Sequence, residues 1–74
     1  MNRQHKALGK RIRQLREDAD VTRATVADKA KITLGGISQI ELGLVSPRLD
    51  TLRRLAKAIG CELSDFFATE NRST

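Results

Sequence analysis

Residues 22–42 read TRATVADKAKITLGGISQIEL, and this stretch carries the most informative pattern of the chain. Its apolar residues recur three and four positions apart, which is typical of helices rather than of strands. Thr22 and Thr33 each stand before such a run, where a threonine hydroxyl can cap the first backbone N–H groups of a helix. Gly43 follows and can take the left-handed conformation that ends a helix. The stretch therefore predicts two helices, over about residues 22–30 and 33–42, joined by a tight turn.

The flanking sequence predicts three further helices. Before the stretch, Leu8, Ile12 and Leu15 recur at helical spacing and indicate a helix over about residues 6–18. After it, Pro47 keeps the glycine-containing segment out of a helix. The remaining signals are apolar residues at helical spacing over about residues 49–59, a stop at Gly60, and Ser64 as the cap of a last short helix through Phe67. The inward-facing residues are expected to be Val26, Ala27, Ala30, Ile37, Ile40, Leu52, Leu55, Ala56 and Ile59.

Length and composition fit one small all-α domain. The 74 residues have room for a single core, so we expect one domain over residues 1–74, ordered over about 6–68 with short mobile termini. The lone Cys61 has no disulfide partner, and no cluster of Cys and His could bind a metal. No apolar run is long enough to span a bilayer. We therefore expect a cytoplasmic protein without cofactor, metal or membrane association, and without the residues of an enzyme active site.

The charge pattern favours a polyanionic partner. The net charge is +5, and six basic residues fall among the first sixteen without one acid. Ordinary solubilising charge would explain this equally well for so small a domain. The two helix starts are more specific, because capped helix N-termini offer N–H groups and a positive dipole end to phosphate oxygens. A short helix pair joined by a tight turn can also set its second helix in a DNA major groove.

In order and spacing, the chain closely resembles the Cro/CI-type (XRE-family) helix-turn-helix domains of phage repressors and small bacterial regulators. The matching segments are LGKRIRQLR (8–16), VADKA (26–30), Ile32-Thr33, ISQIELG (37–43), Ser46-Pro47, LRRLAKAIG (52–60) and LSDFF (63–67). The resemblance implies a compact five-helix, lambda-repressor-like domain whose second and third helices form the helix-turn-helix. It further implies a transcriptional regulator of repressor type that binds double-stranded DNA, usually as a homodimer, with its third helix in the major groove.

Carried over position by position, the resemblance assigns roles to individual residues. The base-reading positions are Leu34, Gly35, Ser38 and Gln39. The positions facing phosphates or the minor groove are Thr22, Arg23, Lys31, Thr33, the backbone from Gly43 to Ser46, and Arg48. Arg16 and Glu41 match a pair that forms a structural ion pair between the first and third helices.

The chain departs from its relatives in ways that affect recognition. Arg23 stands where the family usually has glutamine, and Lys31 replaces a frequent turn glycine, so that a non-glycine residue must be left-handed. In the reading helix, Leu34 can only touch a thymine methyl, and the glycines after it offer no side chain to a base. Gln39 is then the best direct reader, since its amide suits adenine, and DNA shape should contribute to specificity.

A rival hypothesis remains open beside DNA binding. The same fold could serve as a protein-interaction module or antitoxin-type partner through the surface around Leu34 or through the helix carrying Phe66 and Phe67. Those two adjacent phenylalanines cannot both face one core, so one should pack inside while the other is a dimer candidate. Phage repressors, restriction-modification controllers and antitoxins all remain possible, and the operator sequence is not predicted.

Overall fold

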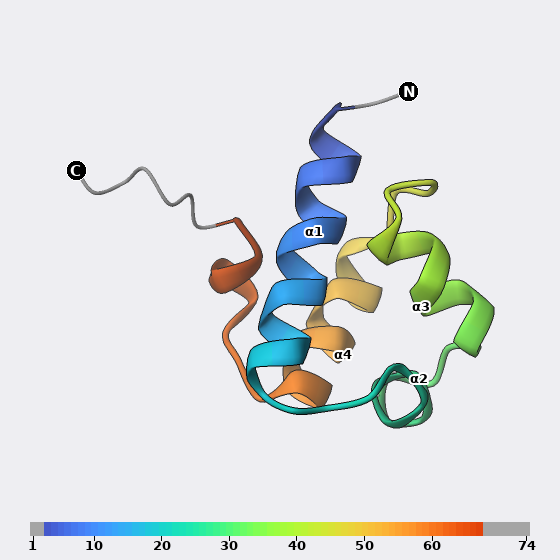
Figure 1. Cartoon of the computed structure of the whole chain (residues 1–74), viewed down its shortest axis with the longest axis vertical. Coiled ribbons are helices and arrows are strands. Elements are labelled where there is room, and N and C mark those ends of the chain that lie inside the picture. The colour runs from blue at the N-terminus through green and yellow to red at the C-terminus, as the bar shows by residue number, and fades with distance from the viewer. Residues whose placement is uncertain (1–2, 68–74) are drawn as a thin grey trace.

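A computed structural model describes residues 3–67, with side chains from residue 5 onward, and the regular secondary structure over that range is all helical. Four α-helices are followed by one 3-10 helix (Figure 1). In chain order they are α1 (Arg3–Asp18), α2 (Arg23–Ala30), α3 (Leu34–Glu41), α4 (Leu49–Ile59) and η1 (Leu63–Phe67). The predicted all-α class is confirmed, although the fifth helix is a single short 3-10 element rather than an α-helix.

The helix-turn-helix forms at the predicted residues and by the predicted caps. Thr22 Oγ1 accepts a hydrogen bond from Thr25 N at 3.1 Å, and Thr33 Oγ1 accepts one from Gly36 N at 2.9 Å. Lys31 ends α2 in the left-handed conformation, with φ 62° and ψ 43°. Gly43, with φ 77°, makes the corresponding left-handed turn after α3. Local hydrogen bonds and backbone conformation therefore fix both ends of the unit.

Two predicted boundaries were wrong. Helix α1 begins at Arg3 rather than near residue 6. Its first turn is polar, so the apolar spacing that predicts the helix does not extend to its true start. Ser64 does not cap the last helix but lies within η1, and the Asp65 carboxylate instead accepts a hydrogen bond from Glu62 N at 2.9 Å. The terminal segments expected to be mobile lie largely outside the described residues.

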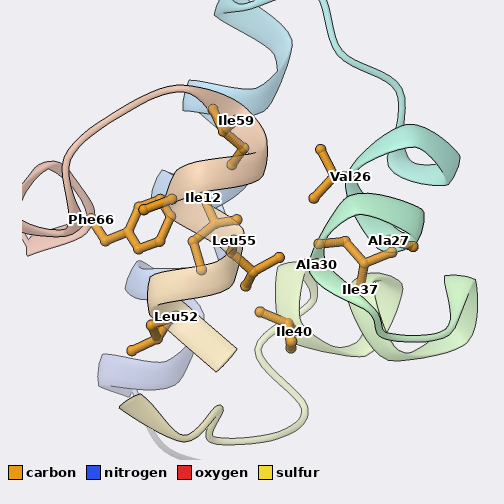
Figure 2. Close-up of a cluster of buried hydrophobic side chains, with 11 residues drawn as sticks. Ile12, Val26, Ala27, Ala30, Ile37, Ile40, Leu52, Leu55, Ile59 and Phe66 are labelled. Carbon is orange, nitrogen blue, oxygen red and sulfur yellow. The ribbon is translucent and has the colours of Figure 1, made fainter. Parts of the chain in front are cut away.

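One cluster of apolar side chains joins all five elements (Figure 2). Ile12, Val26, Ile37 and Leu55 are its largest fully buried members, and η1 contributes Phe66. Helix α3 packs on α1 and α2, α4 packs on α2, and η1 packs on α1 and α4. Every residue predicted to face inward between Val26 and Ile59 is buried, and Leu8 and Leu15 pack against the cluster. This core fixes the position of α3 relative to the rest of the molecule.

Helices α1 and α3 approach each other at backbone distance. A Cβ atom added to Gly9 would collide with the carbonyl oxygen of Ile40 and lie 2.6 Å from that of Glu41. A Cβ on Gly43 would lie 2.7 Å from Lys6 Cα. Glycine is therefore needed on both sides of this crossing, and α3 rests directly on the α1 backbone.

Candidate nucleic-acid interface

Helix α3 has one buried and one exposed face. Ile37 and Ile40 are buried, whereas Leu34 is 54% exposed. Gly35 and Gln39 are also exposed, and Ser38 is partly buried. The four residues predicted to read bases thus all lie outside the core. Leu34 and Gln39 are the two among them that have both an exposed position and a side chain long enough to reach a base. This exposed face of α3, defined by Leu34, Gly35, Ser38 and Gln39, is the candidate reading surface.

A shallow groove connects the reading surface to the N-terminal end of α2. It is lined by Arg16, Thr22, Arg23, Ala24, Leu34 and Ser38. Thr22 precedes the first turn of α2, so free N–H groups and the positive end of the helix dipole lie at the rim. Thr33 and Lys31 are exposed at the turn before α3. The groove therefore combines donors and positive charge with an apolar side chain, as a duplex with phosphates and thymine methyl groups would require.

A buried ionic cluster lies under the groove and joins α1, α2 and α3. Arg16 Nε donates to Glu41 Oε2 at 2.7 Å, and Arg16 Nη2 donates to Glu41 Oε1 at 3.3 Å. Arg16 Nη1 also donates to the Val21 carbonyl at 2.9 Å. The Glu41 side chain is only 1% exposed. The pair expected from the family resemblance is thus present as a forked, buried bridge between α1 and the last residue of α3.

Arg23 has a partner that the sequence analysis missed. Its Nε donates to Glu41 Oε1 at 3.0 Å, while 41% of its side chain remains exposed. The family resemblance implies only a phosphate contact for Arg23. An arginine in place of the usual glutamine was the available signal, because only a cation at this position could complete a second ion pair with Glu41.

Most of the segment between α3 and α4 is exposed and unexpectedly apolar. Gly43 is the exception: it is buried and its N–H donates to the Ile40 carbonyl at 3.1 Å, so the expected phosphate contact of its backbone N–H was wrong. Ser46 and Arg48 are exposed, as a backbone-facing role would require, and Arg48 makes no side-chain cap for α4. The large hydrophobic residues exposed beside them are Leu42, Leu44, Val45 and Leu49. We name these four residues the loop patch. The sequence predicts a loop here but does not predict that these apolar side chains are exposed.

One of the two dimer candidates is excluded by its burial. Phe66 is 2% exposed within the core, so it has no surface to offer a second copy. Phe67 is 56% exposed and keeps that candidacy. The difference follows from their adjacency on η1, whose two neighbouring side chains point in different directions.

The basic face of α1 is partly occupied by intramolecular contacts. Arg11 Nε donates to the Asp65 carbonyl at 2.8 Å and so ties η1 to α1. Arg13 Nε lies 2.9 Å from Glu17 Oε2 in an exposed pair, which raises the pKa of Arg13 and lowers that of Glu17. Lys10 is exposed. The α1 charges thus serve the fold and the surface more than the groove.

Comparison with known proteins agrees with this geometry. The family described as helix-turn-helix matches residues 12–66, so the chain belongs to that family. The resemblance to Cro/CI-type domains is thereby confirmed. Within the described residues, no helix has the length and apolar character needed to cross a membrane.

Individual relatives are regulators. The HTH-type transcriptional regulator PuuR of Escherichia coli is 37% identical over 84% of this chain but only 34% of its own length. The immunity repressor protein of Bacillus phage phi105 is 30% identical over 85% of this chain and 44% of its own. The chain therefore spans less than half the length of these relatives, and what it shares with them is this domain.

Solved structures share the fold. The clp gene regulator ClgR from Corynebacterium glutamicum superposes with a TM-score of 0.84 at 25% identity, over 90% of this chain and 87% of that one. The restriction-modification controller protein C.AhdI from Aeromonas hydrophila gives 0.86 at 23% identity, over 89% of this chain and 100% of that one. The five-element arrangement thus exists both as a whole small protein and as part of larger ones.

Proposed function

We propose that this chain is a sequence-specific, double-stranded DNA-binding regulator of transcription, repressor-like and non-enzymatic, with α3 in the major groove. The observation that carries the proposal is the exposed face of α3, held beside a groove that also contains an arginine and the N-terminal end of α2. The net charge of +5 and the names of the relatives support the same function.

The roles of single residues follow from their exposure. Gln39 reads adenine, and Leu34 contacts a thymine methyl. Phosphates or the minor groove are met by Thr22, Arg23, Lys31, Thr33, the Ser46 backbone, and Arg48. Few side chains reach bases in this arrangement, so the shape of the duplex adds to specificity.

We further propose that the chain acts as a homodimer on a two-fold related site, with half-sites about 34 Å apart. Phe67 supports this, since an exposed phenylalanine on η1 is a natural contact for a second copy. The mass of the complex on selected DNA tests the stoichiometry.

The decisive experiment selects binding sites from random duplexes and then compares the native chain with Gln39→Ala. The variant should lose about 1–3 kcal/mol on the selected site and little on unrelated DNA. Replacing thymine by uracil at single positions of the site removes one methyl group each time, and the position read by Leu34 should then bind more weakly. Equal losses of Gln39→Ala on all duplexes would contradict the reading role.

A protein-binding role is the second candidate, and the loop patch favours it. Leu42, Leu44 and Leu49 are all more than half exposed. Affinity for DNA through phosphates falls steeply with salt, with a log–log slope near −0.9 for each phosphate contact. Absence of salt-dependent binding to duplexes would favour this alternative.

A further inference from the structure

We propose that Glu41 is a positioning residue for DNA binding, because it holds the Arg23 guanidinium at the groove where that guanidinium meets a DNA phosphate. The inference rests on the proposed DNA-binding function. It gives Glu41 a role in addition to its pairing with Arg16, through a contact that the chain gains by having arginine at position 23.

The Glu41 carboxylate is a fixed point. Arg16 grips both of its oxygens, with Nε 2.7 Å from Oε2 and Nη2 3.3 Å from Oε1. The Glu41 side chain is 1% exposed and lies at the end of α3, where that helix rests on the backbone of α1. A second side chain that donates a hydrogen bond to this carboxylate is therefore fixed in position relative to both α1 and α3.

Arg23 is that second donor, and it remains available at the surface. It uses Nε to bind Glu41 Oε1 at 3.0 Å, so the hydrogen bond does not consume its two terminal nitrogens. Those nitrogens form the flat fork of N–H groups that suits a phosphate. Its side chain is 41% exposed and lines the groove with Thr22 and Ser38.

Holding the guanidinium matters because ordering a long side chain opposes binding. An arginine that is free in the unbound protein loses rotamer freedom when it grips a phosphate, and one already tethered loses less. Arg16 also lies 3.8 Å from Glu17 Oε2, whose other partner is Arg13, so the connected network holds three cations and two anions and keeps one positive charge for the ligand. Simple electrostatics makes the opposite prediction, since a carboxylate near the groove repels phosphates.

The two mechanisms differ in the sign of one measurement. Glu41→Gln and Arg23→Ala are made singly and together, and each is titrated against a fluorescent duplex of random sequence at low salt. Positioning predicts that Glu41→Gln weakens binding about three- to tenfold when Arg23 is present and does not weaken it in the Arg23→Ala background. Equal weakening in both backgrounds, or tighter binding in the Arg23 background, would overturn the proposal.

A second variant leaves the buried pair untouched and decides the matter if Glu41→Gln does not fold. Arg23→Lys keeps the charge but replaces the fork by one ammonium, which cannot bind Glu41 and a phosphate through separate arms. We expect it to bind the duplex more weakly than the native chain and more tightly than Arg23→Ala, because it keeps the charge but loses the fork. Arg13→Lys, in the exposed pair with Glu17, is the matched control and should bind like the native chain. Native-like binding by Arg23→Lys would refute the tether.

The free protein supplies a readout independent of DNA. A tethered Arg23 should give a sharp, slowly exchanging Nε–H resonance in the NMR spectrum, and this resonance should broaden in Glu41→Gln. If the Arg23 side chain is free, its Nε–H resonance should be broad in the native chain and should not change in Glu41→Gln. Absence of salt-dependent duplex binding by the native chain would refute the proposed function itself. Normal binding that ignores all changes at Arg23 would refute only the positioning role.

Discussion

The inner face of α3 is tightly packed, whereas its outer face is open to solvent. The inner face is bound by backbone contact with α1 at Gly9, by the apolar cluster, and by the buried bridge from Arg16 to Glu41. At the outer face, a Cβ added to Gly35 would meet nothing within 4 Å. An added methyl group therefore cannot fit at Gly9 of α1, where it would meet the last two residues of α3, whereas at Gly35 in the first turn of α3 it meets only open space.

The largest expected effect is at the bridge. Arg16→Met removes the principal partner of a buried carboxylate, and breaking such a pair destabilises a protein by about 3–5 kcal/mol. Because Arg23 still binds Glu41, we expect a loss near the lower end, measured by urea unfolding. A loss below about 1 kcal/mol, typical of surface pairs, would mean that the inner face tolerates change as the outer face does.

Gly9→Ala should cause the next largest loss of stability. The added methyl would meet the Ile40 and Glu41 carbonyl oxygens, which are backbone atoms and cannot swing aside. Overpacking of this kind destabilises by about 1–3 kcal/mol, and sometimes more, despite the better helix propensity of alanine. Thermal unfolding by circular dichroism measures it, and an unchanged midpoint would contradict the close approach of the two helices.

Gly35→Ala is the matched opposite. The methyl group enters open space in the first turn of a helix, so the chain should gain up to about 1 kcal/mol from alanine's preference for helix. The same unfolding assay applies. Destabilisation would indicate that the outer face is less free than its geometry implies.

The smallest effect is expected at the exposed pair of α1. Arg13→Ala should raise the pKa of Glu17 toward its ordinary value, because the hydrogen bond and charge of Arg13 now lower it. A lowered carboxyl pKa stabilises above the unfolded-state pKa, and that contribution is lost as pH falls through the folded-state value. Since both side chains are about half exposed, we expect the unfolding midpoint at neutral pH to stay the same. NMR titration of Glu17 checks the pKa.

The sequence predicted most of the scaffold, because the scaffold follows local rules. Threonine caps, a stop glycine and apolar spacing fixed α2, α3 and α4 nearly to the residue. The polar first turn of α1 and the 3-10 form of η1 were not predicted, because neither feature produces a pattern of apolar residues in the sequence.

The candidate site was only partly predictable, since its contacts join residues far apart in the chain. Family resemblance supplied the pairing of Arg16 with Glu41, but no spacing rule predicts that Arg23 reaches the same carboxylate from a third helix. Exposure was equally hidden. Leucine is usually a core residue, so the sequence does not predict that Leu42, Leu44 and Leu49 are exposed. Their exposure is seen only in the packed structure.

The glycine crossing has a consequence for specificity engineering. Since α3 is held at its C-terminal end by Gly9 of α1 and along its inner face by the buried Ile37 and Ile40, none of these contacts involves a side chain of its outer face. Leu34, Gly35 and Gln39 could then be exchanged as a set without re-optimising the body beneath them. The chain should accept transplanted recognition residues from other members of its family, which makes it a small module whose target can be rewritten.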